Sequence, residues 1–133
     1  MRLNKMQKVA LDALDEIKGQ DIVVLDVRKL TSMCDTMIVA SAQSTRQVKA
    51  LAGNVRERME AAGATIIGVE GEESSEWVLV DCGDIVVHVM QPAVRAYYKL
   101  EELWTAPAGR KRAAAKDPAV LRPAGSDGDS LAA

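Results

Sequence analysis

Apolar residues recur along the chain with two different periods. A period of three to four residues predicts helices, and short runs or a period of two predict strands. Near the N-terminus they recur every three or four positions, which predicts an amphipathic helix that ends at about Gly19. Its buried stripe would be Leu3, Met6, Val9, Ala10, Ala13, Leu14 and Ile17. A second helix is predicted to start at Ser44, with Gln47 at the capping-box spacing, and to end at Gly63. The buried stripe of that helix would be Val48, Leu51, Ala52, Val55, Met59 and Ala62.

Shorter runs rich in β-branched residues predict five strands. Three of them are DIVVLDV (21–27), TMIVAS (36–41) and ATIIGVE (64–70), and WVLVDCGDIVVHVM (77–90) supplies two more. A last helix is predicted from Pro92 through VRAYYKLEELW, since proline suits the first turn of a helix. From Thr105 the chain is rich in Ala, Pro, Gly and Arg without a period. We therefore expect one domain of residues 1–104 and a disordered tail of residues 105–133.

The order of these elements, α-β-β-α-β-β-β-α, predicts an α/β fold with a mixed five-stranded sheet and flanking helices. The helix between the second and third strands is expected to make a crossover connection. That connection would place a parallel pair, the second and third strands, inside an otherwise antiparallel sheet.

The segment 77–90 reads as a hairpin, and its pattern assigns each residue to a face. If Cys82-Gly83 is a two-residue loop, Asp81 opposes Asp84 and Trp77 opposes His88, and opposed residues share a face. One side, the aliphatic face, is Val78, Val80, Ile85, Val87 and Val89, which must be core. The other side, the mixed face, is Trp77, Leu79, Asp81, Asp84, Val86, His88 and Met90.

Three hypotheses fit the mixed face. As a reaction centre it would need a nucleophile or metal beside His88, and the two aspartates lie near the turn instead, where carboxylates usually accept backbone N–H groups. A helix could cover the face, which would make Trp77 part of a core. The third hypothesis is a partner surface, because Trp with aliphatic residues and a charged rim is typical of binding hot spots.

Composition and charge narrow the function classes. Apolar residues make up 48% of the chain but aromatic ones only 3%, with no Phe, so the core must be aliphatic. The tail holds five basic and three acidic residues, which leaves 12 basic against 16 acidic residues in 1–104, a net of −4. Such a domain suits a basic partner better than a phosphate backbone.

The sequence lacks the patterns of disulfide-rich, metal-binding, secreted and membrane-spanning proteins. Cys34 and Cys82 cannot form a disulfide framework, and there is no CxxC metal site. The charged N-terminus lacks the apolar region of a signal peptide, and no window approaches the roughly 18 apolar residues of a membrane-spanning helix. We expect a soluble, cytoplasmic protein.

An enzyme of similar layers, a nucleotidyltransferase, would need a Gly-Ser turn and paired aspartates for metal and phosphate. The corresponding turn would be SAQS (41–44), which has no Gly, and no Asp-x-Asp follows it. We therefore predict no catalytic residues, no metal site and no cofactor. A metal-dependent nucleotidyl or phosphoryl transferase remains the alternative.

Several of these segments together resemble the ribosome silencing factor family, also called the Iojap family. They are LDVRKLTSMCDTMIVAS, STRQVKALA, VEG, WVLVDCGDIVVHVM and RAYYKLEELW. The chain departs from the family pattern at Thr36, Cys82 and Met90, where aromatic residues are common. The resemblance covers most of residues 5–104 and is expected to end at Trp104.

The resemblance implies a nucleotidyltransferase-like fold without the active site. It also implies binding to the large ribosomal subunit through the uL14-type ribosomal protein, which would block small-subunit joining and damp translation when nutrients are scarce. Self-association as a homodimer is implied as well.

We predict that the partner-binding residues lie on the mixed face and the last helix: Trp77, Leu79, Asp81, Val86, His88, Met90, Arg95 and Tyr98. For Arg95, Tyr98 and Glu101 the alternative is a network within a solvated helix face. Trp104 is expected to anchor the end of that helix in the core. The tail segment GRKRAAAK is either a solvated run of charge or a weak contact to ribosomal RNA.

Overall fold

The computed structural model describes the backbone of residues 2–98 and the side chains of residues 5–96. The observed elements are α1 (Arg2–Glu16), β1 (Gln20–Asp26), β2 (Thr36–Ser41), α2 (Thr45–Ala61), β3 (Gly68–Glu70), β4 (Trp77–Asp81), β5 (Ile85–Met90) and α3 (Pro92–Tyr98). They confirm the predicted element order and the α/β class. The third strand is shorter than the predicted 64–70, and the boundary predicted at Trp104 lies outside the described residues. No helix within residues 2–98 is long and apolar enough to cross a membrane.

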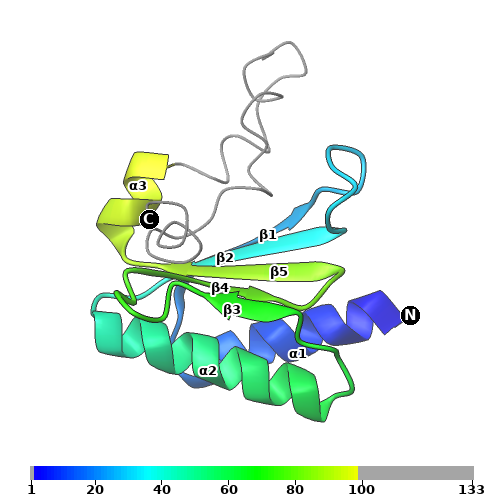
Figure 1. The fold of residues 1–133 in the computed structure, drawn as a ribbon, viewed down its shortest axis with the longest axis horizontal. Coiled ribbons are helices and arrows are strands. Elements are labelled where there is room, and N and C mark those ends of the chain that lie inside the picture. The colour runs from blue at the N-terminus through cyan, green and yellow to red at the C-terminus, as the bar shows by residue number, and fades with distance from the viewer. Residues whose placement is uncertain (1, 99–133) are drawn as a thin grey trace, which may run out of the picture.

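The sheet is mixed and five-stranded, as predicted, but its strand order is β1-β2-β5-β4-β3. The parallel neighbours are β2 and β5, and the other pairs are antiparallel. The prediction that the second and third strands pair is therefore wrong. The crossover through α2 leads from β2 to β3, which is the edge strand. The β4–β5 hairpin lies between β2 and β3 (Figure 1).

The hairpin register also differs from the prediction. Trp77 lies opposite Met90 and Leu79 lies opposite His88, a shift of two residues from the predicted pairing. The Cys82 N–H donates to the Ile85 carbonyl at 2.9 Å, so the turn is Gly83-Asp84 rather than Cys82-Gly83. Gly83 has φ +86°, and a two-residue turn accepts glycine at either central position, depending on its type. A shift of two keeps every strand residue on its predicted face.

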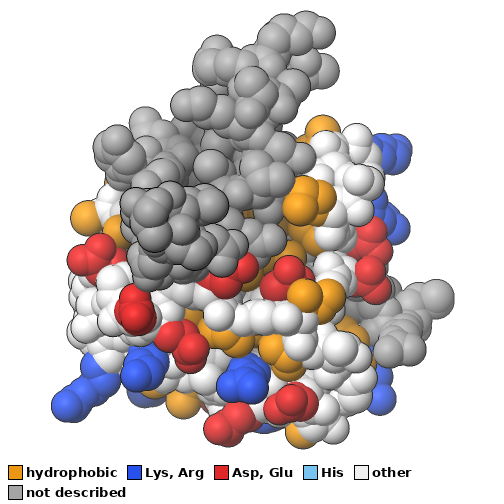
Figure 2. All heavy atoms as spheres, in the orientation of Figure 1, with side chains coloured by type: hydrophobic (Ala, Val, Ile, Leu, Met, Phe, Trp, Pro, Cys, Tyr) orange, Lys and Arg blue, Asp and Glu red, His pale blue; other side chains and the backbone are white. Residues whose placement is uncertain are grey.

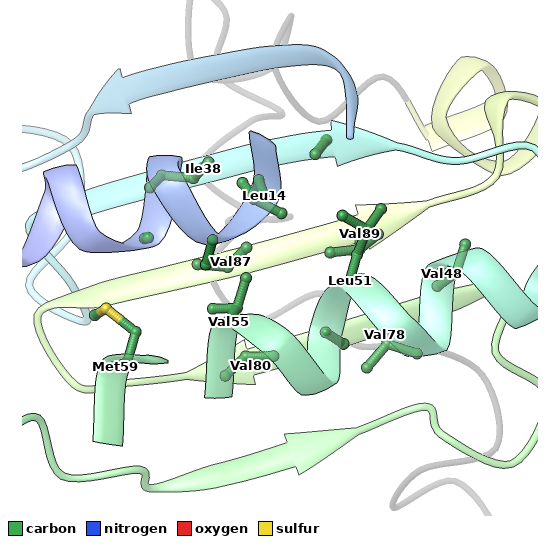
Figure 3. Close-up of a cluster of buried hydrophobic side chains, with 14 of the residues drawn as sticks. Leu14, Ile38, Val48, Leu51, Val55, Met59, Val78, Val80, Val87 and Val89 are labelled. Carbon is green, nitrogen blue, oxygen red and sulfur yellow. The ribbon is translucent and has the colours of Figure 1, made fainter. Parts of the chain in front are cut away.

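The aliphatic face is covered by α1 and α2, which lie side by side below the sheet in Figure 1. Figure 3 shows the side chains of α2 pointing onto β4 and β5. The predicted stripe of α2 is buried at Val48, Leu51, Ala52, Val55 and Met59. All five predicted residues of the aliphatic face belong to the same cluster and are at most 2% exposed, which confirms that this face is core.

Polar side chains fix the junction between the two helices. Ser44 caps α2 by accepting the N–H of Gln47 at 3.1 Å, as the capping-box spacing predicts. The Gln47 amide instead turns to α1 and donates to the carbonyls of Ile17 and Lys18 at 3.2 and 3.3 Å. The left-handed residue after α1 is Lys18, with φ +62°, and not the predicted Gly19. Gly19 permits a close approach, since a Cβ there would lie 3.1 Å from the Leu14 carbonyl oxygen.

Gln47 is therefore expected to stabilise α1 more than its own helix. Gln47→Ala should lower the free energy of unfolding by about 1 kcal/mol, because two carbonyls at the end of α1 lose a donor. Ser44→Ala should cost a similar amount, about 1 kcal/mol, through loss of the N-cap. Urea unfolding of both variants measures the effects. Arg46→Ala is the control, and a loss no larger for Gln47→Ala than for this exposed neighbour would contradict the prediction.

Candidate functional site

The mixed face is the side of the sheet away from α1 and α2. Strand pairing arranges it in three rows, because directly paired residues share a face. The central row is Glu70, Leu79, His88, Val39 and Val23; its neighbours are Trp77, Met90, Ser41 and Gln20 on one side and Gly68, Asp81, Val86, Met37 and Leu25 on the other. Six of the predicted binding residues thus share one face. Asp84, which is also predicted on this face, lies in the turn instead.

Trp77 and His88 are diagonal neighbours on this face and contact each other. The indole N–H of Trp77 donates to His88 Nδ1 at 2.9 Å, and the ring centroids lie 5.7 Å apart at 44°. An indole N–H can only donate, so Nδ1 accepts and His88 holds its proton on the other ring nitrogen. The Trp77 N–H and the His88 Nδ1 are therefore both engaged in a hydrogen bond inside the protein.

Most of the mixed face is buried. Leu79, His88 and Met90 are 0% exposed, Trp77 is 3% exposed and Val86 8%, while Asp81 is half-buried. The hypothesis of an open docking face requires exposure at Trp77 and His88, whereas the hypothesis of a covered face requires burial. The burial supports a covered face at these two residues. Whether any of these side chains contacts a partner stays a prediction.

The end of the face at Trp77 is closed by α3, which lies across the sheet from α1 and α2 (Figure 1). Val94 packs against Trp77 and Met90. Arg95 is 9% exposed, and its Nη1 donates to the Ser41 hydroxyl at the end of β2 at 2.8 Å. The alternative of a solvated network within the helix is therefore wrong for Arg95. The side chain of Tyr98, together with Glu101 and Trp104, lies outside the described residues.

The two aspartates of the hairpin bond to backbone N–H groups, Asp81 through its side chain within the turn and Asp84 through its backbone carbonyl at the start of β2. Asp81 accepts the backbone N–H of Gly83 at 2.9 Å, and the Asp84 carbonyl accepts the N–H groups of Asp35 and Thr36 at 2.8 and 3.0 Å. Asp81 pairs with Val86, whereas His88 pairs with Leu79 in the next row of the same face. Within the part of the chain that the structure describes, no group of three or more His, Cys, Asp or Glu could hold a metal ion.

Sequence reasoning missed Ser41 and Val94 as members of this region. Ser41 ends a strand, and the sequence reasoning considered it only as part of a phosphate turn. Val94 lies in a helix of seven described residues, which is too short for an apolar period to mark its buried side. The period of two pointed to Ser41, which is separated from Val39 by one residue and shares its face, whereas no local signal marked Val94.

Cys82 is held in a form of low reactivity. Burial, followed by the nearby charge of Asp81, raises the pKa of the Cys82 thiol from 9.0 to about 11. Because only the thiolate reacts, a shift of this size lowers the reactive fraction near pH 8 about a hundredfold.

In a Cys34→Ser variant, which leaves Cys82 as the sole cysteine, alkylation by iodoacetamide at pH 8 should therefore be about a hundredfold slower when folded than in urea. Raising the pH towards 11 should speed the folded reaction, since the thiolate then forms. Mass spectrometry of timed samples gives both rates. Equal rates in the two states would show that Cys82 is open and unperturbed.

Comparisons with known proteins agree on one family. A family profile described as "Ribosomal silencing factor during starvation" matches residues 1–129, past the expected limit at Trp104. A Chromobacterium violaceum protein named ribosomal silencing factor RsfS is 57% identical over 104 residues, which are 78% of this chain and 85% of the relative. A mouse protein, "Mitochondrial assembly of ribosomal large subunit protein 1", is 30% identical over 95 residues, which cover 69% of this chain and 42% of that protein.

A solved structure gives the same answer for the fold. The crystal structure of a Chromobacterium violaceum protein superposes with a TM-score of 0.78 at 55% sequence identity, covering 80% of this chain and 89% of that one. At that identity the two chains share sequence as well as topology.

Proposed function

Because the chain belongs to the ribosomal silencing factor family, we propose that it binds the large ribosomal subunit through the uL14-type ribosomal protein and sterically blocks joining of the small subunit. Translation would thereby be damped when nutrients are limited. The coarser role, a ribosome-associated regulator of translation, follows from the family itself.

The family match carries this proposal, and two further observations support it. One relative, the mouse protein, is named for assembly of the large ribosomal subunit, which favours that subunit over the small one. Residues 1–104 carry 12 basic and 16 acidic residues, and an acidic domain suits a basic ribosomal protein because complementary charge speeds encounter.

Purified protein should pellet with isolated large subunits and lower the yield of joined ribosomes when small subunits are added. Sucrose-gradient sedimentation of both mixtures measures binding and joining separately. Bovine serum albumin, another acidic protein, controls for non-specific trapping. Co-sedimentation with small subunits alone, or with neither subunit, would overturn the proposal.

Calorimetry tests the alternative function, a metal-dependent nucleotidyl or phosphoryl transferase. We expect no heat on titrating ATP with Mg²⁺ into the protein, and measurable binding would favour the enzyme. Homodimer formation and a contact between the basic tail and ribosomal RNA stay predictions, as does the role of the mixed-face residues.

A further inference from the structure

The loop between β1 and β2, residues 27–35, is ordered by its own hydrogen bonds. At its neck the Val27 N–H donates to the Asp35 carbonyl at 2.9 Å. Inside it, the N–H groups of Leu30 and Thr31 donate to the Val27 carbonyl at 2.9 and 3.1 Å. The Met33 N–H donates to the Thr31 hydroxyl at 3.1 Å. These bonds connect residues at the neck of the loop and within it.

The same loop is anchored to the mixed face. Val27 and Cys34 are 0% and 4% exposed and belong to the buried cluster that includes Val86. The Asp84 carbonyl joins the loop to the β4–β5 turn through the N–H groups of Asp35 and Thr36. The loop and the turn are therefore joined to each other, at the end of the sheet away from α3 (Figure 1).

The loop leaves two large apolar side chains exposed to water. Leu30 is 56% exposed and Met33 48%, and they are two of the four exposed large apolar residues in the described part of the chain. In Figure 2 hydrophobic side chains reach the surface at the upper right, where Figure 1 places this loop, with charged side chains beside them. An ordered loop that buries Val27 and Cys34 yet presents Leu30 and Met33 is typical of a binding surface.

The charges at this end favour a basic partner. Arg28 is occupied by Asp26, to which its guanidinium donates at 2.7 and 3.0 Å, and these bonds lower the pKa of the Asp26 carboxyl. Asp35 is half-buried and Asp84 is exposed, while Lys29 is the remaining cation of the loop. The carboxylates are therefore in excess around the apolar pair.

We propose that Leu30 and Met33, with Asp84 joined to the same loop at Asp35, form the contact surface for a basic protein that carries an apolar patch bordered by Lys or Arg. We call these three residues the loop patch. The inference rests on the proposed function, which makes that partner a protein of the large ribosomal subunit. It moves the predicted contact from the buried residues of the mixed face to the exposed residues of the loop.

The test compares full-length variants in large-subunit pelleting. Leu30→Ser combined with Met33→Ser should weaken binding at least about tenfold, as expected for removing central apolar contacts, with an unchanged melting midpoint. Val24→Ser is the matched control, because Val24 is 37% exposed and pairs with Ile38 in the row of Val87, on the opposite face of the sheet. It should bind within about twofold of wild type, as is usual for residues outside a hot spot.

A charge reversal tests the nature of the partner. Asp84→Lys should weaken binding about fivefold or more in low salt and less in high salt, because salt screens an exposed charge. Tighter binding of Asp84→Lys would mean that the partner surface is acidic or a phosphate backbone, which overturns the assignment.

The other outcomes separate this inference from the proposed function. If wild type pellets with large subunits and the double variant pellets equally well, the loop patch is wrong and the proposed function stands. If wild type does not pellet with large subunits, both the loop patch and the proposed function are wrong. A melting midpoint lowered by many degrees in the double variant would show that Leu30 and Met33 pack internally. Loss of a dimer in sedimentation velocity, with ribosome binding retained, would assign the loop patch to a second copy of this chain instead.

Discussion

Val87→Asp should abolish cooperative folding. Val87 lies on the central strand β5, is 0% exposed, and faces α1 and α2 within the aliphatic cluster. An unpaired charge placed there costs several kcal/mol or more, comparable to the roughly 5–15 kcal/mol that stabilises a whole domain. Circular dichroism during thermal and urea unfolding should show no native baseline, or a midpoint lowered by tens of degrees.

Val24→Asp is the matched control for this change. Val24, Ile38 and Val87 pair in one row across β1, β2 and β5, so Val24 shares the face of Val87 but lies on the edge strand. It is 37% exposed, and a carboxylate there can reach water. The loss should stay near 1 kcal/mol, the usual cost of a poor β-former on a strand. A Val87→Asp protein that melts like Val24→Asp would show that the aliphatic face is not core.

The side to which each strand residue points could be predicted from the sequence. The period of two separates Val87 from His88 whatever the partner strand is, so the aliphatic face was correct although the register was not. The capping pattern located the start of α2 at Ser44 for a similarly local reason. These predictions succeed because they depend on neighbours a few residues away.

What could not be predicted depends on distant parts of the chain. A glycine fits either central position of a two-residue turn, so the sequence could not choose between Cys82-Gly83 and Gly83-Asp84. Periodicity finds strands but not their neighbours, and the parallel pair of β2 and β5 was missed for that reason. The coverage of Trp77 by Val94 depends on where a short helix folds back, which no local pattern reports.

The candidate site was predicted unevenly for the same reason. The period of two placed Trp77, Leu79, His88 and Met90 correctly on one face. The composition of that face could not tell a binding surface from a core, because both are apolar with a few polar groups. The exposed residues Leu30 and Met33 carried no periodic signal and lay between the predicted strands 21–27 and 36–41.

Trp77→Ala should destabilise the protein by about 3–5 kcal/mol, the usual range for removing a buried large aromatic side chain. Trp77 is 3% exposed, packs with Met90 and Val94, and donates to His88 Nδ1 at 2.9 Å. The variant loses the packing and leaves the imidazole acceptor without its donor. At roughly 4–8 °C per kcal/mol for a domain of about this size, the melting midpoint should fall by about 12 °C or more.

A double-mutant cycle separates the hydrogen bond from the packing. Trp77→Phe keeps most of the ring but removes the N–H, whereas His88→Ala removes the acceptor and leaves a buried indole N–H that costs about 1–3 kcal/mol. The coupling free energy from urea unfolding of the two single variants and the double variant should be about 1 kcal/mol. Coupling near zero would show that the bond contributes nothing to stability.

The same variants decide what the mixed face is for. One outcome is that Trp77→Ala unfolds readily while the loop-patch variant stays folded and loses ribosome binding. Trp77 then stabilises the fold, and the contact with the ribosome lies at the loop. If Trp77→Ala instead melts within about 1 kcal/mol of wild type, as exposed positions do, and no longer pellets with large subunits, the face is open in solution. In that case α3 must move aside to admit the partner. Because Arg95 bonds Ser41 from α3, Arg95→Met should then strengthen ribosome binding, whereas a closed core would give weaker or unchanged binding.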